Sequence, residues 1–318
     1  MASKTFIELQ MQVIQLVKQD KHGEALMEIE EAKQWFPERL DRLGHWKANL
    51  YAIKGEKEKA LSELNEVLEK GLWWNPDLLT SDPELETIKD EDGFKSVVEK
   101  CRKIYSKLHQ ESRSDLIVQG NPEADQMLFA LHWKGSNARD FALQWKDDRL
   151  IDTYRIGFPQ SSQLFSHACY TWDDYELTKR DIRMTFAQFS EEQLQSDFES
   201  IIAGASQGGK VSVQMCLDKG MEEFHSFIAI VPAFDVEEMK TLLEDDFDTD
   251  VRGCIITGDE DPFYQQALET YHLLIEAGIE CKWIVKNGMG HVLPEDLADV
   301  IDEAVGFVSE GNMLSNRE

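Results

Sequence analysis

The apolar residues of this chain follow two different periods, and the change near residue 110 limits the folds that it can adopt. From Phe6 to Leu108 they recur every three or four residues, which is typical of amphipathic helices, and no strand is predicted there. After residue 114 they form short runs, each ended by turn residues and mostly separated by segments of helical length. The sequence therefore predicts an all-α domain over residues 1–110 and an α/β domain over residues 111–318.

Two turns of the first domain are each followed by an Ala-Leu step, and the two alanines, Ala25 and Ala60, lie 35 residues apart. Small side chains at such positions let the two helices of a hairpin approach closely, and Pro37 ends the first unit. With Ala32 seven residues after Ala25, the segment resembles the tetratricopeptide repeat, and residues 71–100 resemble the closing unit of such an array. The resemblance implies a helical repeat domain that binds a protein partner or a second copy of the chain.

Seven apolar runs of the second domain predict strands, and longer segments between several of them predict helices. The predicted strands are residues 115–120, 127–133, 154–159, 200–206, 227–234, 254–261 and 281–288. The predicted helices include residues 191–199, 210–220, 263–278 and 295–308. This alternation predicts a mostly parallel sheet covered by helices on both faces, with its chemistry at the carboxyl ends of the strands.

Acidic side chains are concentrated in the second domain. Residues 1–110 hold 17 basic and 21 acidic side chains, residues 111–318 hold 16 basic and 40 acidic ones, and the net charge is −28. This balance argues against nucleic acid and anionic membranes as partners, because Lys and Arg supply most contacts to phosphate. The acidic run EDDFDTD, residues 244–250, lacks the Gly and Glu positions of an EF-hand loop, so we expect a solvated loop there.

The remaining composition indicates a reduced, cytoplasmic protein without a cofactor. No run of 18 apolar residues and no charged start followed by an apolar stretch is present, so neither a membrane span nor a secretory signal is expected. The five cysteines occur singly, which predicts reduced and mostly buried thiols. No histidine or cysteine has the spacing of metal ligands, so we expect no metal or other cofactor.

The segment IIAGASQGGK places Ser206 between a predicted strand and a predicted helix. A tight turn there forces the serine backbone into a strained conformation, which requires small neighbours such as Gly204 and Gly208. The helix N-terminus and the Gln207 N–H would then face a developing oxyanion. A structural glycine turn is the alternative, whereas a phosphate-binding loop is disfavoured because Lys210 is not followed by Ser or Thr.

A serine hydroxyl needs a base to react, and the base needs a carboxylate that fixes its tautomer. Both residue types follow later predicted strands: Asp259 and Asp261 stand in CIITGDEDP, and His291 stands in CKWIVKNGMGHVLP. Because the carboxyl ends of parallel strands meet at one edge of a sheet, these side chains are expected to lie near Ser206. The order nucleophile, acid, base predicts a catalytic triad with either aspartate as the acid.

The motifs GASQGG, GDEDP and GMGHVLP, in this order between residues 115 and 310, resemble the α/β-hydrolase superfamily and particularly its small serine carboxylesterases. By this resemblance Ser206 is the nucleophile, His291 is the general base, and Asp261, which stands directly before a proline, is the acid. The resemblance implies hydrolysis of a carboxylic ester or thioester through an acyl-enzyme. The segments PQSSQ and YTWDDYE resemble further parts of these esterases.

The segment MLFALHWKGSNARDF resembles the strand and HG loop that supply the second oxyanion donor in this family. Trp133 stands where the family has glycine, so the donor beside the Gln207 N–H is the N–H of Lys134 or of Trp133, and alignment to the loop favours Lys134. The resemblance also implies that Trp133 and Trp172 line the substrate pocket. His132 is expected to be a structural hydrogen-bonding residue.

Together these features predict a serine hydrolase acting on a small or medium ester or thioester. Two alternatives stay open: a serine peptidase that uses the same triad, and an interaction protein whose repeats recruit a partner while the hydrolase domain is secondary or inactive. No long insertion follows the predicted strand at residues 227–234, so residues 233–250 are expected to form only a small acidic cap.

Overall fold

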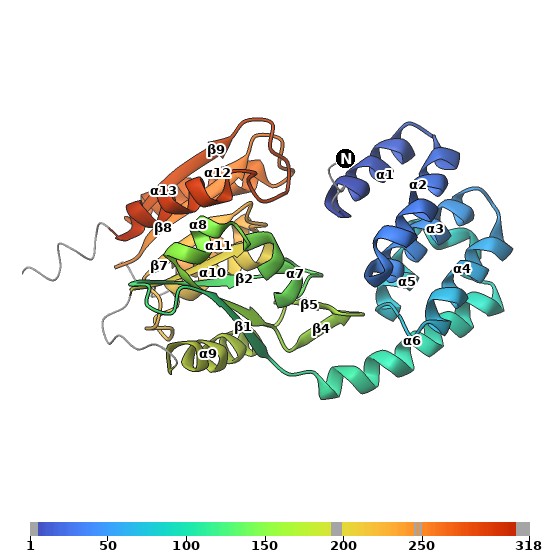
Figure 1. Cartoon of the computed structure of the whole chain (residues 1–318), viewed down its shortest axis with the longest axis horizontal. Helices are drawn as coiled ribbons and strands as arrows, with labels where there is room; N and C mark the ends of the chain where they lie inside the picture. The colour runs from blue at the N-terminus through green and yellow to red at the C-terminus, as the bar shows by residue number, and fades with distance from the viewer. Residues whose placement is uncertain (1–5, 192–198, 245–246, 248–249, 310–318) are drawn as a thin grey trace, which may run out of the picture. The chain divides into compact units, whose positions relative to one another are not determined.

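The computed structural model describes residues 6–191, 199–244, 247 and 250–309, and the chain forms two compact units (Figure 1). These units are Met1–Glu111 and Ser112–Glu318, so their boundary lies one residue after the one predicted from the sequence. Within the described residues, no helix combines the length and the apolar character needed to cross a membrane.

The regular elements described in the first unit are all helical. They are α1 (Phe6–Lys18), α2 (His22–Trp35), η1 (Pro37–Arg39), α3 (Leu40–Ile53), α4 (Lys57–Glu69), α5 (Pro76–Ser81), η2 (Pro83–Ile88) and α6 (Asp92–Glu111), coloured blue to cyan-green in Figure 1. Helix α3 begins 34 residues after α1, and α4 begins 35 residues after α2. Two helix pairs therefore follow one another with the period seen in the sequence.

Small side chains allow close packing within these helix pairs. Ala25 in α2 and Ala60 in α4 occupy equivalent positions and are fully buried. The second small position holds Ala32 in α2 but Val67 in α4. Gly44 of α3 makes room for this valine, since a Cβ at Gly44 would lie 2.3 Å from a Val67 methyl carbon. The larger residue in the second pair is thus compensated by a glycine on the facing helix.

Seven strands form the sheet of the second unit in the order β1-β3-β2-β6-β7-β8-β9 (Figure 1). They are β1 (Asp115–Gly120), β2 (Gln126–Leu131), β3 (Arg155–Gln160), β6 (Glu199–Ala205), β7 (Ser226–Ile230), β8 (Arg252–Gly258) and β9 (Glu280–Lys286). The pair β1 and β3 is antiparallel, and the other neighbours in this sheet are parallel. Each of the seven apolar runs predicted as strands contributes one of these strands.

Helices cover both faces of this sheet and produce two separate cores. One face packs against α9 (Tyr175–Glu191), α10 (Gln207–Leu217), α11 (Val236–Glu244) and α12 (Tyr264–Glu276). The other face packs against α7 (Ala138–Ala142), η3 (Leu143–Trp145), α8 (Asp148–Thr153) and α13 (Leu297–Ser309). The five cysteines are all buried and form no disulfide within the described residues, and the burial was predicted. A mostly parallel sheet with helices on both faces is the predicted arrangement, and it fits the α/β-hydrolase fold.

A two-stranded hairpin lies outside the main sheet and is not among the predicted strands. It consists of β4 (Gln163–Ser166) and β5 (Cys169–Thr171), which pair antiparallel. Strands of four and three residues are too short for a clear alternating pattern. Their connection also lacks the glycine that marks most two-residue hairpin turns, since Ala168 takes the positive φ of 48°.

Two helical segments complete the comparison with the sequence. Helix α9 lies outside the predicted helices, although Ile182, Phe186 and Phe189 are buried at a helical spacing that could have indicated it. The helix predicted over residues 191–199 falls mostly outside the described residues, and Glu199 belongs to β6 rather than to a helix. The acidic run at residues 244–250 is likewise described only in part, with Glu244 ending α11.

Candidate active site

Ser206 occupies the sharp turn between β6 and α10. Its backbone has φ 56° and ψ −116°, a positive φ that side-chain-bearing residues rarely adopt. The turn is held from both sides: the Ser206 N–H donates to the Ile230 carbonyl at 2.9 Å, and the Ser206 carbonyl accepts from the Lys210 and Ala233 amides at 3.0 and 3.1 Å. Strain at this position is therefore stabilised by the surrounding backbone, and the hydroxyl is presented at the end of a central strand.

Two glycines make this turn sterically feasible. A Cβ at Gly204 would lie 2.3 Å from the Gly208 carbonyl oxygen, and a Cβ at Gly208 would lie 2.4 Å from the Leu131 carbonyl oxygen. Both contacts are with backbone atoms that cannot move aside without shifting a strand or a helix. The close approach lets α10 cross directly over β2 and β6.

The three residues predicted as a triad form a continuous hydrogen-bonded series. His291 Nε2 lies 2.8 Å from Ser206 Oγ, and His291 Nδ1 lies 2.9 Å from Asp261 Oδ2. A neutral imidazole that donates from Nδ1 to the carboxylate can accept the serine proton at Nε2. The side chain of Asp261 is fully buried and that of His291 is 27% exposed, so the series runs from the interior to the surface.

Asp261 and Asp259, the two alternatives for the acid, have different partners. The second oxygen of Asp261 accepts from the Phe263 N–H at 2.7 Å, which fixes the carboxylate beneath His291. Asp259 is exposed, and its Oδ1 accepts from the Gly288 N–H at 2.6 Å. The loop after β8 is thereby joined to the loop after β9. The structure brings Asp261 to the histidine, whereas Asp259 connects the two loops that carry the acid and the base.

Gln207 is the first residue of α10, so its N–H is one of the amides that the helix itself does not use. The side chain of Gln207 is 7% exposed and hydrogen-bonded at both ends. Its Oε1 accepts from Trp172 N–H at 3.0 Å and from Thr171 Oγ1 at 3.1 Å, and its Nε2 donates to Asp173 Oδ1 at 2.7 Å. The side-chain amide of Gln207 is therefore fixed by the last residue of β5 and the two residues that follow it.

The loop after β2 carries the other residues predicted for the site. The Lys134 ammonium donates to both oxygens of Asp173, at 2.8 and 2.9 Å. Trp133 is partly buried; its ring lies 5.9 Å from the His291 ring and 6.0 Å from Phe141. Phe263 contacts His291 with ring centroids 5.1 Å apart. Two aromatic side chains thus lie against the imidazole.

His132 and Trp172 are structural supports of this loop. His132 is fully buried, and burial lowers its pKa to about 4 even though its Nδ1–H donates to the Trp133 carbonyl at 2.8 Å. Gln160 lies 3.3 Å from the other ring nitrogen. The Trp172 indole, 3% exposed, donates to the His132 carbonyl at 3.0 Å. Trp172 therefore packs against the loop after β2, and little of its surface is left to line the substrate pocket predicted from the sequence.

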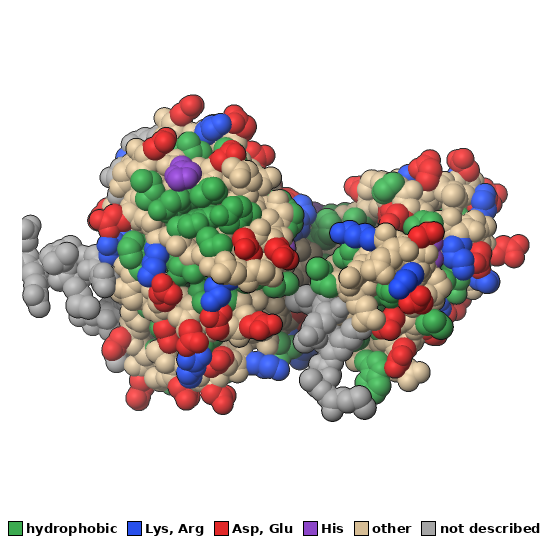
Figure 2. All heavy atoms as spheres, turned by 90° about the horizontal axis from the view of Figure 1, so that it is seen from above, with side chains coloured by type: hydrophobic (Ala, Val, Ile, Leu, Met, Phe, Trp, Pro, Cys, Tyr) green, Lys and Arg blue, Asp and Glu red, His purple; other side chains and the backbone are tan. Residues whose placement is uncertain are grey.

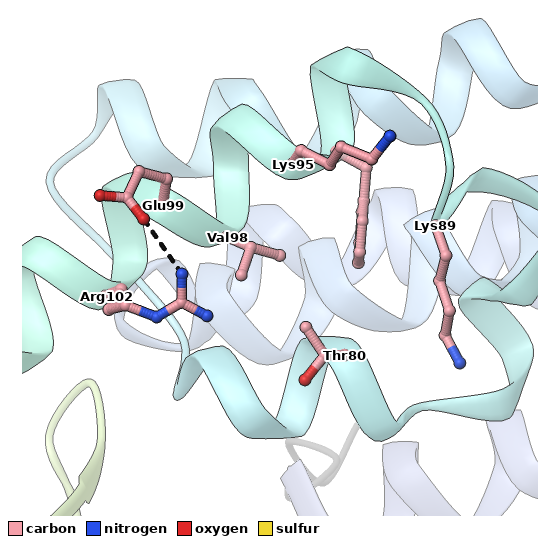
Figure 3. Close-up of a pocket in the computed structure, with 7 residues that line it drawn as sticks. Thr80, Lys89, Lys95, Val98, Glu99 and Arg102 are labelled. Carbon is pink, nitrogen blue, oxygen red and sulfur yellow. Dashed lines mark hydrogen bonds and ion pairs between the residues drawn. The ribbon is translucent and has the colours of Figure 1, made fainter.

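Two cavities lie in the helical unit. One, of about 470 Å³, is lined by Thr80, Lys89, Phe94, Lys95, Val98, Glu99 and Arg102 (Figure 3). Figure 3 shows Arg102 paired with Glu99, at 3.0 Å. The other, of about 290 Å³, is lined mostly by apolar residues of α1 and α3. Neither contains a nucleophile with a neighbouring base, and the described residues hold no cluster of three His, Cys, Asp or Glu side chains suited to a metal.

The helical unit matches a known protein family. Residues 5–109 match the family described as A/B hydrolase-like, N-terminal domain. This match covers about a third of the chain and coincides with the first unit, so it concerns the helices and not the residues around Ser206. The comparison with curated proteins gave no match.

Solved structures resemble the chain at low sequence identity. An uncharacterized protein from Bacillus cereus ATCC 10987 is 23% identical, covers 96% of this chain and 99% of its own length, and has a TM-score of 0.51. A ferulic acid esterase is 18% identical over 63% of this chain and 99% of its own length, with a TM-score of 0.49. Est1E from Butyrivibrio proteoclasticus with bound ferulic acid is 14% identical over 64% of this chain and 96% of its own length, with a TM-score of 0.47. At these identities the first likeness shows a shared fold across both units, and the two esterases carry no argument about activity.

Proposed function

We propose that the second unit is a serine esterase that hydrolyses a small or medium carboxylic ester or thioester through an acyl-enzyme on Ser206. The observation that carries the proposal is the hydrogen-bonded series from Ser206 through His291 to the buried Asp261, with distances of 2.8 and 2.9 Å. A hydroxyl, an imidazole and a carboxylate in this order are suited to nucleophilic acyl transfer.

The reaction follows from the roles that these side chains can take. His291 Nε2 accepts the Ser206 proton as Oγ attacks the carbonyl carbon, and the imidazolium then gives that proton to the leaving oxygen or sulfur. The buried Asp261 carboxylate stabilises the imidazolium and keeps Nδ1 protonated. The amide of Gln207, with that of Lys134 or Trp133, donates to the oxyanion of the tetrahedral intermediate. Water deacylates the enzyme by the same path.

The charge around the site favours neutral over anionic substrates. Figure 2 shows one face of the second unit, where carboxylates surround a patch of hydrophobic side chains. Near the triad, Asp259 and Glu260 are exposed, and the Lys134 charge is already paired with Asp173. Trp133 and Phe263 offer apolar surface beside the base. A neutral acyl group with apolar character therefore suits this site best.

The test is hydrolysis of p-nitrophenyl acetate and butyrate by the wild type and by Ser206→Ala, together with labelling by a fluorophosphonate. We expect the wild type to hydrolyse and to be labelled, and Ser206→Ala to lose both, with kcat reduced by about 10⁵-fold. Ser190→Ala serves as the control, because its hydroxyl donates to the Ala187 carbonyl within α9 and Ser190 is not a residue of the proposed site. Equal hydrolysis by the wild type and Ser206→Ala would refute the proposal. A panel of thioesters and peptides then distinguishes an esterase from a serine peptidase.

We propose in addition that the first unit is a repeat domain of the tetratricopeptide type that docks a protein or a second copy of the chain. Among the described residues, five of the eight most exposed large apolar side chains lie in this smaller unit: Met11, Ile14, Met27, Trp35 and Ile53. Where exposed apolar side chains adjoin one another, they are typical of interaction surfaces.

Sedimentation of the full chain tests this role. We expect self-association, or recovery of a partner from lysate, that is lost in the variant M27S/W35S, whose side chains are 66% and 70% exposed in the native chain. Met184→Ser, 60% exposed but in the second unit, is the matched control. Identical behaviour of both variants and the wild type would contradict docking through these residues.

A further inference from the structure

The segment that follows β5 contacts both parts of the proposed oxyanion hole. The loop after β2 is attached to β5 by two backbone hydrogen bonds, from Gly135 N–H to the Tyr170 carbonyl and from Tyr170 N–H to the Ser136 carbonyl, each of 2.8 Å. One and two residues further along, Thr171 and Trp172 bind the Gln207 side chain. The hairpin thus connects the end of β2 to the start of α10, although its two strands do not belong to the main sheet.

Asp173 completes this connection through side chains alone. Its Oδ1 accepts from Gln207 Nε2 at 2.7 Å and from Lys134 Nζ at 2.8 Å, and its Oδ2 accepts from the same ammonium at 2.9 Å. Gln207 and Lys134 are 73 residues apart in sequence, yet one carboxylate binds both. Gln207 supplies one amide proposed to bind the oxyanion, and Lys134 is the favoured one of the two candidates for the other.

We propose that Asp173 is a positioning residue that holds the Gln207 and Lys134 amides at the separation needed to bind the oxyanion. The inference rests on the proposed esterase function and adds a residue outside the triad on which the rate depends. Oxyanion donors act only when they are preorganised, because the gain is lost if the protein must reorganise during the reaction. A carboxylate bonded to both side chains restricts the relative motion of their backbones.

The electrostatics of this contact fit a fixed and ionised carboxylate. Partial burial raises the pKa of Asp173, but the hydrogen bonds from Lys134 and Gln207 and the nearby ammonium outweigh that effect and hold its pKa below the usual value. The Lys134 ammonium balances the charge, so the carboxylate binds Gln207 without placing an unpaired anion near the oxyanion. Removal of the carboxylate would therefore free the Lys134 ammonium and leave the Gln207 side chain held only through its Oε1.

The experiment compares Asp173→Ala with Glu176→Ala on p-nitrophenyl butyrate. Glu176 is a nearby exposed carboxylate, and no described contact joins it to the two oxyanion loops. We expect kcat to fall about 10- to 100-fold in Asp173→Ala with KM within twofold of the wild type, and no change in Glu176→Ala. The inhibition constant of a trifluoromethyl ketone, whose adduct places an oxyanion in the same position, should rise by the same factor. A purely structural residue would not link these two quantities.

The possible results separate the positioning role from the proposed function. A wild type that neither hydrolyses the ester nor reacts with a fluorophosphonate overturns both. An active wild type with unchanged kcat and ketone inhibition in Asp173→Ala overturns the positioning role alone, and so does a loss that arises in KM or is shared by Glu176→Ala. If Asp173→Ala does not fold, Lys134→Met replaces it, because the lysine side chain is half exposed and its backbone amide is retained. A three- to tenfold loss in kcat, matched by the ketone, is then expected, and an unchanged kcat refutes the role.

Discussion

The two sides of the site around Ser206 are built in different ways. On the side of the proposed triad, here the triad side, Ser206, Asp261 and His291 follow parallel strands of one sheet, and backbone contacts fix the loops that carry them. On the oxyanion side, the loop after β2 is joined to α10 through a small separate hairpin and the side chains of Gln207 and Asp173. The triad side therefore depends on the fold itself, whereas on the oxyanion side the connection between the hairpin and α10 depends on a few side-chain bonds that substitution can adjust.

Among variants that keep Ser206, the largest effect is expected at Asp261, the proposed acid of the triad. In Asp261→Asn the side-chain amide would donate to His291 Nδ1, so the imidazole proton would stay on Nε2. A protonated Nε2 cannot accept the proton of the serine hydroxyl. We expect kcat for p-nitrophenyl butyrate to fall about 10⁴-fold with the fold intact. Asp259→Asn is the control, since its amide oxygen can still accept the Gly288 N–H. A larger loss at Asp259 than at Asp261 would assign the acid to Asp259 instead.

A second prediction concerns the backbone of the triad side. A Cβ at Gly258 would lie 1.8 Å from the Met289 carbonyl oxygen, and the Gly258 carbonyl itself accepts from the Asp261 N–H at 3.1 Å. Gly258→Ala should therefore separate the acid loop from the histidine loop, with about 3 kcal/mol lost from the free energy of unfolding. Denaturation by guanidinium measures this loss.

The matched control is Gly290→Ala, beside His291, where an added Cβ meets no atom within 4 Å. It should change the free energy of unfolding by less than about 0.5 kcal/mol. Equal destabilisation by both variants would show that the two loops are not held by the close approach at Gly258.

The contrast between the two sides also explains what the sequence could predict. The seven strands, and the placement of Ser206, Asp261 and His291 after three of them, follow from local features: short apolar runs, small residues in a turn, and residues directly beyond a strand end. A parallel sheet then brings the ends together without further information. The role of Asp259 required the structure, because both aspartates have the same local setting.

The oxyanion side lacks such local signals. Strands β4 and β5 are too short to show a period. Ala168 takes the positive φ of their turn, and a glycine at this position would have indicated the turn in the sequence. Asp173 reads as one more carboxylate in an acidic segment, and its bonds to Lys134 and Gln207 span 39 and 34 residues. Side-chain bonds between distant loops depend on the assembled fold, so periodicity and spacing could not reveal them.

A third prediction uses the buried histidine of the oxyanion side. The folded-state pKa of His132, about 4, lies below the unfolded value near 6.5, so the unfolded chain binds the proton first as the pH falls. The stability due to neutral His132 is complete above about pH 6.5 and is lost between there and about pH 4. Between pH 7 and 4.5 the wild type should lose about 2 kcal/mol more than His132→Asn, measured by denaturation at both values. Parallel losses would show that His132 titrates normally.

The smallest effect is expected at Asp259. Substitutions at this residue distinguish a role in positioning a loop from a role in catalysis. Its Oδ1 accepts from the Gly288 N–H at 2.6 Å on the exposed side of the two loops. Asp259→Ala removes this bond, so we expect about 1 kcal/mol of lost stability and a two- to fivefold fall in kcat, because His291 is held less firmly. Asp259→Asn keeps an acceptor oxygen and should restore both values, whereas the same substitution at Asp261 abolishes activity. Asparagine thus substitutes for an aspartate that only joins two loops, but not for one that fixes a tautomer, and a failure of Asp259→Asn to recover would mean that the charge of Asp259 itself acts on His291.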